Sequence, residues 1–174
     1  NVPLDKTIDI ILHRIYDEKE IDTNISRSDL KQLLILCTKH VHFTFNNETY
    51  IQTDGVAMGS PLGSILSDIC MVDLETTLLP TLTDHIKDWS RYVDDTISIV
   101  KTDSINHIIA VLNSFHPNIQ FTHEIEANNK IPFLDITIIR NNTTLSTTVY
   151  RKSTNSDIYI HWKAFVPLKK HGTL

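Results

Sequence analysis

The residues of this sequence with the clearest capacity for chemistry are two adjacent carboxylates, Asp94 and Asp95. A short apolar entry precedes them and an alternating, β-branched run follows at 96–100, which predicts a tight hairpin with the acids at or near its tip. Neighbouring aspartates repel each other, so keeping both ionised costs free energy unless a cation or a hydrogen-bond donor lies close by. Mg²⁺ suits such a pair, because it is commonly held by one or two carboxylates together with substrate phosphates. The alternative is a solvated turn, since Asp is a common turn residue.

A glycine-containing segment at residues 52–63 is the second candidate. Ser60 followed by Pro61 predicts a helix N-cap and a first-turn proline, and a helix with an apolar face is expected after them. Gly55 and Gly59 allow the backbone to pass close to a flat or bulky group such as a nucleotide or a template base. The start of the helix presents free N–H groups to an anion. A plain glycine loop before a capped helix is the competing interpretation.

Length and composition limit the class of protein. At 174 residues and 41% hydrophobic content, the chain is long enough to bury a core and has the size of one domain. It contains no apolar run of the length that a bilayer needs and no basic-then-apolar signal segment. Cys37 and Cys70 lack C-x-x-C spacing, so a disulfide framework or a zinc site is not expected. These features predict an intracellular protein, nuclear or cytoplasmic, without a membrane partner.

The charge is unevenly distributed along the chain. The total of −5 argues mildly against a nucleic-acid binder, a class that is usually basic. Residues 1–129 carry 9 Lys and Arg against 19 Asp and Glu, whereas residues 130–174 carry 7 against 2. The C-terminal quarter therefore has the electrostatic reason to meet a phosphate backbone. A solvated basic face is the alternative.

The pattern of apolar residues and turn signals predicts a mixed α+β chain. Helices are expected over the first 16 residues, from about Ser28, after Ser60, and from the capping segment 102–104 to His116-Pro117. Strands are expected as a strand–turn–strand unit at 41–52, and then at 120–126, 131–139 and 144–150, with turns at Asn128-Asn129 and Asn141-Asn142.

Several of these segments together resemble reverse transcriptase motifs B, C and E, which would occur here in the family's order. The matching segments are Gly55–Gly63, Tyr92–Asp95 and Phe133–Ile136. The amino-acid sequences of these motifs are similar to those of the reverse transcriptase of Penelope-like retroelements, and this similarity covers essentially the whole chain. It is carried by Asn1–Asp5, Gln52–Gly63, Ile131–Ile136 and Tyr150–Asn155.

The resemblance implies a polymerase right-hand palm, an antiparallel sheet packed on helices, with part of the fingers and the start of the thumb. It divides the chain into fingers and palm helices at 1–80, palm with the Asp94-Asp95 hairpin at 81–130, and primer grip with the start of the thumb at 131–174. The implied activity is RNA-directed DNA synthesis with two Mg²⁺ or Mn²⁺ ions. The implied partners are an RNA template, a DNA primer and deoxynucleoside triphosphates.

The resemblance also implies roles for individual residues. Asp94 and Asp95 match the catalytic, metal-binding carboxylates of motif C. The nucleotide- or template-binding residues are Gly55, Met58, Gly59, Ser60 and Tyr92, and the primer grip is Phe133, Leu134 and Asp135. Many retroviral-type enzymes have Gln where Met58 stands. Nucleic-acid backbone contacts are expected at Lys130, Arg151 and Lys152, with ordinary surface lysine as the alternative for Lys130.

One expected element is missing from the sequence. Motif A, with its metal-bridging aspartate, is expected only a few residues before Asn1, so the chain is interpreted as a fragment that is inactive or nearly inactive in isolation. A catalytically dead relic that binds only nucleic acid or a partner protein is a second hypothesis. A telomerase-type reverse transcriptase is a third hypothesis, and it fits the sequence of the segment Phe133–Ile136 less well.

Overall fold

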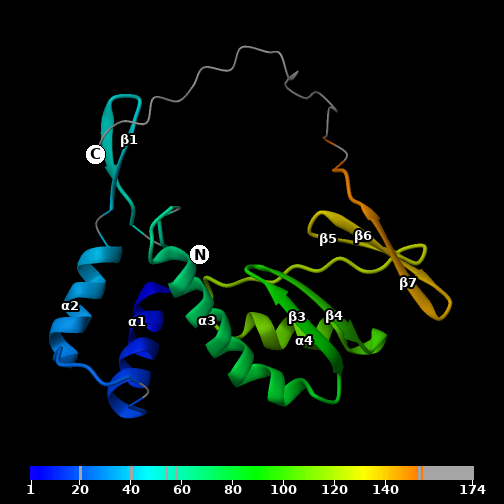
Figure 1. The fold of residues 1–174 in the computed structure, drawn as a ribbon, viewed down its shortest axis with the longest axis horizontal. Helices are drawn as coiled ribbons and strands as arrows, with labels where there is room; N and C mark the ends of the chain where they lie inside the picture. Colours follow the sequence, from blue (N-terminus) through cyan, green and yellow to red (C-terminus); the bar gives the residue numbers. More distant parts are fainter. Residues whose placement is uncertain (20, 40, 54, 58, 153, 155–174) are drawn as a thin grey trace. The chain divides into compact units, whose positions relative to one another are not determined.

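The computed structural model describes residues 1–19, 21–39, 41–53, 55–57, 59–152 and 154. It shows a mixed α+β protein in which short antiparallel sheets accompany helices (Figure 1). The chain divides into two units, Asn1–Glu124 and Ile125–Leu174. No helix in the described ranges is both long and apolar enough to cross a membrane.

The first unit contains all the α-helices of the described residues. Helix α1 begins after Pro3 and continues into a π-helical turn, and Ser26 caps α2 by accepting a hydrogen bond from the amide of Asp29 at 3.2 Å. The helices are α1 (Leu4–Leu12, then the π-helical turn His13–Asp17), α2 (Arg27–Thr38), α3 (Gly63–Leu78, then the 3₁₀ turn Leu79–Leu82) and α4 (Ile105–Asn113, after the 3₁₀ turn Thr102–Ser104).

Three separate antiparallel sheets are formed by adjacent strands. The first unit has two hairpins, β1–β2 and β3–β4, and the second unit has the three-stranded sheet β5–β6–β7. The strands are β1 (His42–Phe45), β2 (Glu48–Ile51), β3 (Ile86–Tyr92), β4 (Asp95–Val100), β5 (Lys130–Phe133), β6 (Ile136–Asn141) and β7 (Thr144–Val149).

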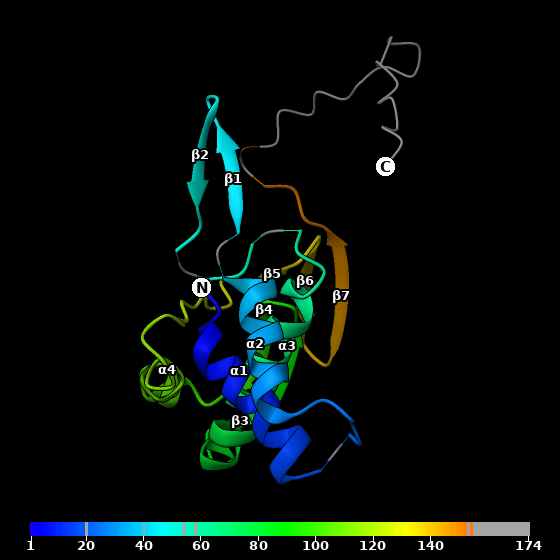
Figure 2. The same cartoon turned by 90° about the vertical axis from the view of Figure 1, so that its left-hand side faces the viewer.

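The core of the first unit lies between helices and the β3–β4 hairpin. Buried residues of α3, of the 3₁₀ turn after it and of α4 form one cluster, against which Trp89 of β3 and Val100 of β4 pack. Helix α1 packs on α3 through its buried side, and it lies beside α2 and α3 in both views (Figures 1 and 2). The hairpin that carries the acid pair is therefore supported by buried apolar surface.

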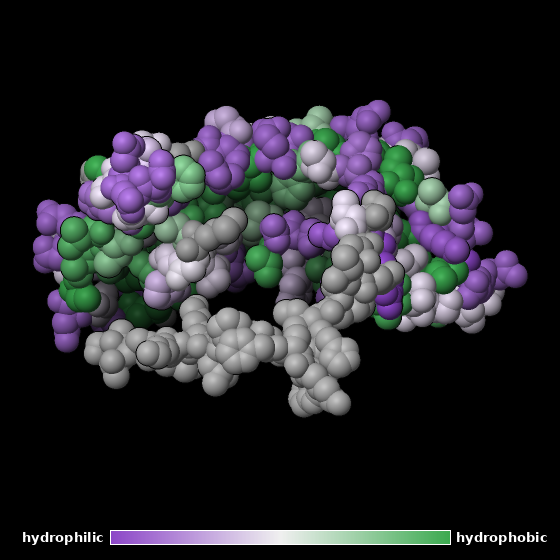
Figure 3. Space-filling view, turned by 90° about the horizontal axis from the view of Figure 1, so that it is seen from above, coloured by the Kyte–Doolittle hydropathy of each residue, from purple (hydrophilic) through white to green (hydrophobic). Residues whose placement is uncertain are grey.

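The α2 helix and the β1–β2 hairpin have few buried side chains. Leu36 of α2 is 75% exposed and Phe45 of β1 is 69% exposed. Hydrophobic surface, green in Figure 3, is visible among hydrophilic surface on the face drawn there. Thr38 is the only buried residue of α2.

Two strand predictions were wrong. Residues 120–126 have an alternating pattern but form no strand, because no strand of the described chain pairs with them. Instead the amide of Phe121 donates to Asn113 Oδ1 at 2.6 Å, and Phe121 packs against the core. The single strand expected at 131–139 is a hairpin, since Leu134 and Asp135 form a turn between β5 and β6.

Helix boundaries also differ from the prediction at two places. Helix α4 ends at Asn113, short of His116-Pro117. Helix α3 begins at Gly63, and its N-cap position is Leu62, so Ser60 is not the N-cap. The Ser60 carbonyl accepts from the amide of Gly63 at 2.9 Å, so the Ser-Pro pair forms a turn that leads into the helix.

Candidate active site

The acid pair lies at the tip of the β3–β4 hairpin, as the sequence predicts. Tyr92 pairs with Asp95 as the last register pair, and Val93 and Asp94 form the two-residue turn. Tyr92, Asp94 and Asp95 are all exposed. Both carboxylates are therefore open to solvent and to any ligand that reaches the tip.

The turn itself has an unfavourable residue at its first position. Val93 has φ = 57°, in the left-handed region, whereas Asp94 has no positive φ. A positive φ at the first central residue only is the pattern of a type II′ hairpin turn, which normally has Gly there. A β-branched residue in this conformation is strained, so the surrounding structure has to stabilise it.

Arg91 links the hairpin to α3. Its Nε donates to Glu75 Oε1 at 2.7 Å, and its Nη2 donates to Asp68 Oδ1 at 3.0 Å. The side chain of Arg91 is 12% exposed and that of Glu75 is 18% exposed, so this ion pair is largely shielded from water. The hydrogen bond with Glu75 raises the pKa of the Arg91 guanidinium above its usual value. Trp89 Nε1 also donates to Glu75 Oε1, at 2.9 Å.

These contacts fix the direction in which the hairpin points. Along β3, Trp89 contacts Glu75, whereas Arg91 reaches both Glu75 and Asp68, which lies nearer the start of α3. The tip therefore points toward the N-terminal end of α3, where the glycine-containing loop enters the helix.

Two glycines of the glycine-containing loop, Gly55 and Gly59, have a left-handed backbone. Gly55 has φ = 74° and Gly59 has φ = 84°, which agrees with the permissive backbone expected of them. A Cβ at Gly55 would lie 3.5 Å from the side chain of Asn1, and one at Gly59 would meet no atom within 4 Å. Ser60 is half-buried, and Met58 lies outside the described residues.

A cavity of about 390 Å³ lies beside this loop. The last residue of β2, the two residues after it and those at the start of α1 contribute to it, and Lys6, Lys39 and Asp5 add charge. Asp94 and Asp95 do not line it, so the acid pair and the loop do not share this cavity.

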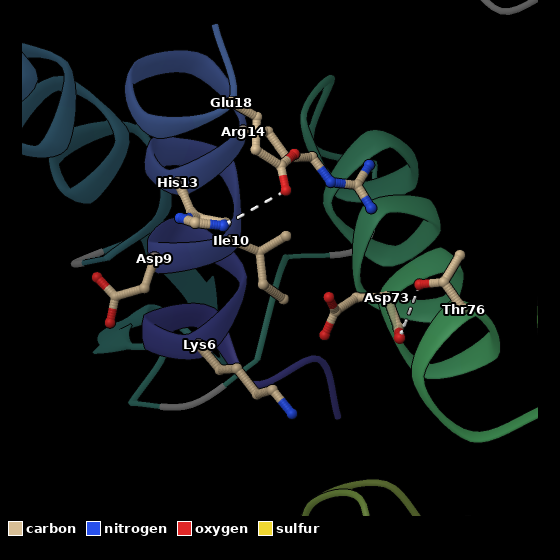
Figure 4. Close-up of a pocket in the computed structure, with 8 residues that line it drawn as sticks. All are labelled: Lys6, Asp9, Ile10, His13, Arg14, Glu18, Asp73 and Thr76. Carbon is tan, nitrogen blue, oxygen red and sulfur yellow. Dashed lines mark hydrogen bonds and ion pairs between the residues drawn. The ribbon is translucent and has the colours of Figure 1, made fainter. Parts of the chain in front are cut away.

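A larger cavity of about 750 Å³ lies between α1 with its π-helical turn and α3 (Figure 4). Its lining mixes basic side chains, including Arg14, with acidic ones, including Asp73. His13 is paired with Asp17 at 2.9 Å and with Glu18 at 3.4 Å. The acid pair does not line this cavity either.

The primer-grip residues of the prediction belong to the second unit. Phe133 pairs with Ile136 across a tight turn in which Leu134 has φ = 55°, so this turn repeats the strained apolar-Asp arrangement of the β3–β4 tip. The carbonyl of Asp135 accepts from the amide of Tyr150 at 2.8 Å, which ties the turn to the end of β7.

The predicted backbone-contact residues also belong to the second unit. Lys130 is exposed at the first position of β5, and Arg151 and Lys152 are exposed just after β7. The lysines further along the basic C-terminal segment lie outside the described residues.

The donor chemistry of the tip fits a hard divalent cation, but only in part. Asp94 and Asp95 supply carboxylate oxygens, the ligands that Mg²⁺ prefers. Within the described ranges, no three residues among His, Cys, Asp and Glu gather into a metal-binding group. Among the described residues, the two aspartates are therefore the side chains at the tip that could hold the metal.

Sequence reasoning missed Arg91, Glu75 and Asp68 as parts of the site. Arg91 stands three residues before Asp94. Asp68 and Glu75 are two helical turns apart on α3, hence on one face of that helix. A basic residue on a strand and two acids on one helix face are a usable signal only once the strand and helix are known to pack together.

No protein-family model, no curated protein and no solved structure matches the chain.

Proposed function

We propose that this chain is part of the catalytic domain of an RNA-directed DNA polymerase of the kind found in Penelope-like retroelements. The observation that carries the proposal is the β3–β4 tip, where two exposed carboxylates follow a strained residue and the hairpin is anchored to α3. Strained backbone clusters at functional sites, because folding alone selects against it. A solvated Asp-Asp turn needs neither the strain nor the anchor.

In this proposal the first unit supplies the palm. The β3–β4 hairpin packed on α3 and α4 would be the part of the palm sheet that carries motif C, and Gly55–Ser60 would be the motif B loop. The second unit would supply the primer grip at Phe133–Asp135 and the start of the thumb. Lys130, Arg151 and Lys152 would contact phosphates without regard to sequence.

The reaction would be an in-line displacement on a deoxynucleoside triphosphate. The primer 3′-hydroxyl oxygen bonds to the α-phosphorus, the bond to the bridging oxygen breaks, and pyrophosphate leaves. Two Mg²⁺ or Mn²⁺ ions, when bound, would stabilise the attacking and leaving oxygens. Asp94 and Asp95 would hold the ions together with a further carboxylate, which the resemblance assigns to motif A. The loop glycines would let the backbone approach the nascent base pair.

Primer extension on a poly-rA/oligo-dT substrate with Mg²⁺ or Mn²⁺ tests this proposal. The 174-residue chain alone is expected to show little or no synthesis, because the described residues bring no third His, Cys, Asp or Glu side chain to the acid pair. Robust synthesis by this chain would overturn the requirement for a further carboxylate.

The same assay on a gene product that includes motif A tests the function itself. We expect synthesis that Asp94→Asn lowers by roughly a thousandfold or more, since removing a metal ligand removes most of the charge stabilisation of the reacting oxygens. The matched control is Asp88→Asn, which alters an exposed acid on the same hairpin and should leave the rate unchanged. Equal activity of the Asp94→Asn variant and its control would refute the proposal.

A relic that only binds nucleic acid or protein is the second candidate. The observation in its favour is the exposed aromatic surface of the β1–β2 hairpin, where Phe43 stacks on Tyr50 with ring centroids 5.6 Å apart. The gene separates the two candidates: an intact motif A aspartate in one open frame supports the enzyme, and a stop codon or a replaced aspartate supports the relic.

A further inference from the structure

We infer that Arg91 is a positioning residue for the acid pair: it holds the strained Val93 turn in the one conformation that presents Asp94 and Asp95 together. This role rests on the proposed polymerase function, because it concerns the metal-binding residues of that reaction. The Arg91 guanidinium makes four hydrogen bonds, and these bonds and the charges they involve support this role.

The first contact is made at the turn itself. Arg91 Nη1 donates to the carbonyl oxygen of Val93 at 3.1 Å. That carbonyl belongs to the peptide group between Val93 and Asp94, and a peptide group is planar. Fixing its oxygen therefore fixes the direction in which the chain enters Asp94. The bond acts on the one peptide of the tip that follows the left-handed residue.

The remaining contacts hold the guanidinium on α3. Nε donates to Glu75 Oε1 at 2.7 Å, and Nη2 donates to Glu75 Oε2 at 3.3 Å and to Asp68 Oδ1 at 3.0 Å. Because the guanidinium is planar and its donors have a fixed fork geometry, these bonds set its orientation as well as its position. The Val93 carbonyl is thus tied, through one rigid group, to a helix.

The charges around Arg91 agree with positioning and not with neutralisation of the acid pair. Arg91 forms its ion pairs with Asp68 and Glu75. Throughout the described residues, neither Asp94 nor Asp95 takes part in an ion pair. The positive charge of Arg91 is therefore already balanced on α3, and the two carboxylates at the tip keep their demand for a cation.

Two substitutions separate these effects. Arg91→Lys keeps the positive charge, but an ammonium group lacks the planar fork that reaches the Val93 carbonyl and both helix acids at once. Val93→Gly removes the strain that the Arg91 hydrogen bonds offset, because glycine adopts a positive φ without a steric penalty. The effect of Arg91→Lys should accordingly be large with Val93 and small with glycine at that position.

The test uses the 174-residue chain and nuclear magnetic resonance of its backbone amides. In Arg91→Lys we expect the amide signals of Val93, Asp94 and Asp95 to shift and broaden, and in the double variant with Val93→Gly we expect sharp, single signals. Asp68→Asn serves as a milder second variant, because Asp68 is 64% exposed and its loss buries no charge. Arg140→Lys, which alters an exposed ion pair with Glu126 in the second unit, is the control.

Titration with Mn²⁺ on the same samples adds a readout that a purely structural role of Arg91 would not change. We expect Mn²⁺ to broaden the amides of Asp94 and Asp95 before that of Asp88, and Arg91→Lys to weaken this binding roughly tenfold, as loss of a group that orients metal ligands does. With Val93→Gly in place, the same substitution should change the affinity by less than about threefold.

The outcomes distinguish the inference from the proposed function. Unchanged tip signals and a Mn²⁺ affinity within twofold of the original chain in Arg91→Lys would overturn the positioning role while leaving the function standing. Absence of selective broadening at Asp94 and Asp95 in the original chain would instead count against the metal site. A change in tip signals that Val93→Gly does not reverse would also overturn the role assigned to Arg91.

Discussion

The two hairpins of the first unit solve the same geometric problem with different residues. In β1–β2 the turn is Asn46-Asn47, with φ values of 51° and 62°, and Asn tolerates the left-handed region because its short polar side chain bonds locally. In β3–β4 the turn is Val93-Asp94, with the positive φ on a β-branched residue. One turn has residues that suit its backbone, and the other does not.

The two hairpins also differ in the tertiary contacts that stabilise them. Every residue of β1 and β2 is exposed, and the stacked pair of Phe43 and Tyr50 is their main side-chain contact. In β3–β4, Trp89 packs against the core and Arg91 is bonded to α3. The relaxed turn thus belongs to the weakly supported hairpin, and the strained turn to the anchored one.

The difference between the two turns indicates which hairpin presents functional side chains. A hairpin that exists to connect two strands can take the residues that its turn prefers. A hairpin whose tip presents particular side chains has less choice, and tertiary contacts have to offset the strain. Substitutions made in matched pairs, one on each hairpin, test whether the two hairpins differ in this way.

The largest effect is expected from the supporting aromatic residues. Trp89→Ala should lower the free energy of unfolding by about 3 kcal/mol, because it removes a large side chain from the core and a hydrogen bond to Glu75. Phe43→Ala should cost less than about 1 kcal/mol, the range of a cross-strand pair. Urea denaturation followed by circular dichroism measures both. Similar losses would show that the two hairpins are equally supported.

A smaller effect of opposite sign is expected at the tips. Val93→Gly should raise the free energy of unfolding by about 1 kcal/mol, since the relief of left-handed strain exceeds the entropy cost of glycine and Val93 is exposed. Asn46→Gly should change it by a few tenths of a kcal/mol at most. A loss of stability in Val93→Gly would mean that the valine is not strained.

The smallest effect is expected beside the acid pair. The buried hydroxyl oxygen of Thr96 has no hydrogen-bond partner among the described residues, so Thr96→Val should raise the free energy of unfolding by about 0.5 kcal/mol. Thr44→Val, on an exposed position of β1, should have no measurable effect. The same denaturation experiment applies, and destabilisation by Thr96→Val would indicate that the hydroxyl has a partner such as water.

Much of the local structure could be predicted from the sequence. The Asn46-Asn47, Asn128-Asn129 and Asn142 turns carry their own signals, and so does the hairpin around Asp94. The apolar spacing of the first helix and of the helix after Ser104 also reports their packing faces.

What the sequence did not predict depends on partners distant in the chain. The alternation at 120–126 describes a side-chain pattern, but a strand also requires a neighbour, and none pairs with it in the described residues. The turn at Leu134-Asp135 was missed because its first residue is not a usual one for a positive φ. The hydrogen bonds of the Arg91 guanidinium were not predicted, because Asp68 and Glu75 come close to it only after α3 and β3 have packed.

The pairing of β4 has a practical consequence. It bonds to β3 on one side, and along its other side no strand of the described chain satisfies its amides and carbonyls. An open sheet edge of this kind recruits strands from other molecules, the more so because Ile99 leaves apolar surface beside it, at 58% exposure. We therefore expect concentration-dependent self-association of this chain, which light scattering would detect and which a short strand-forming peptide complementary to β4 would suppress.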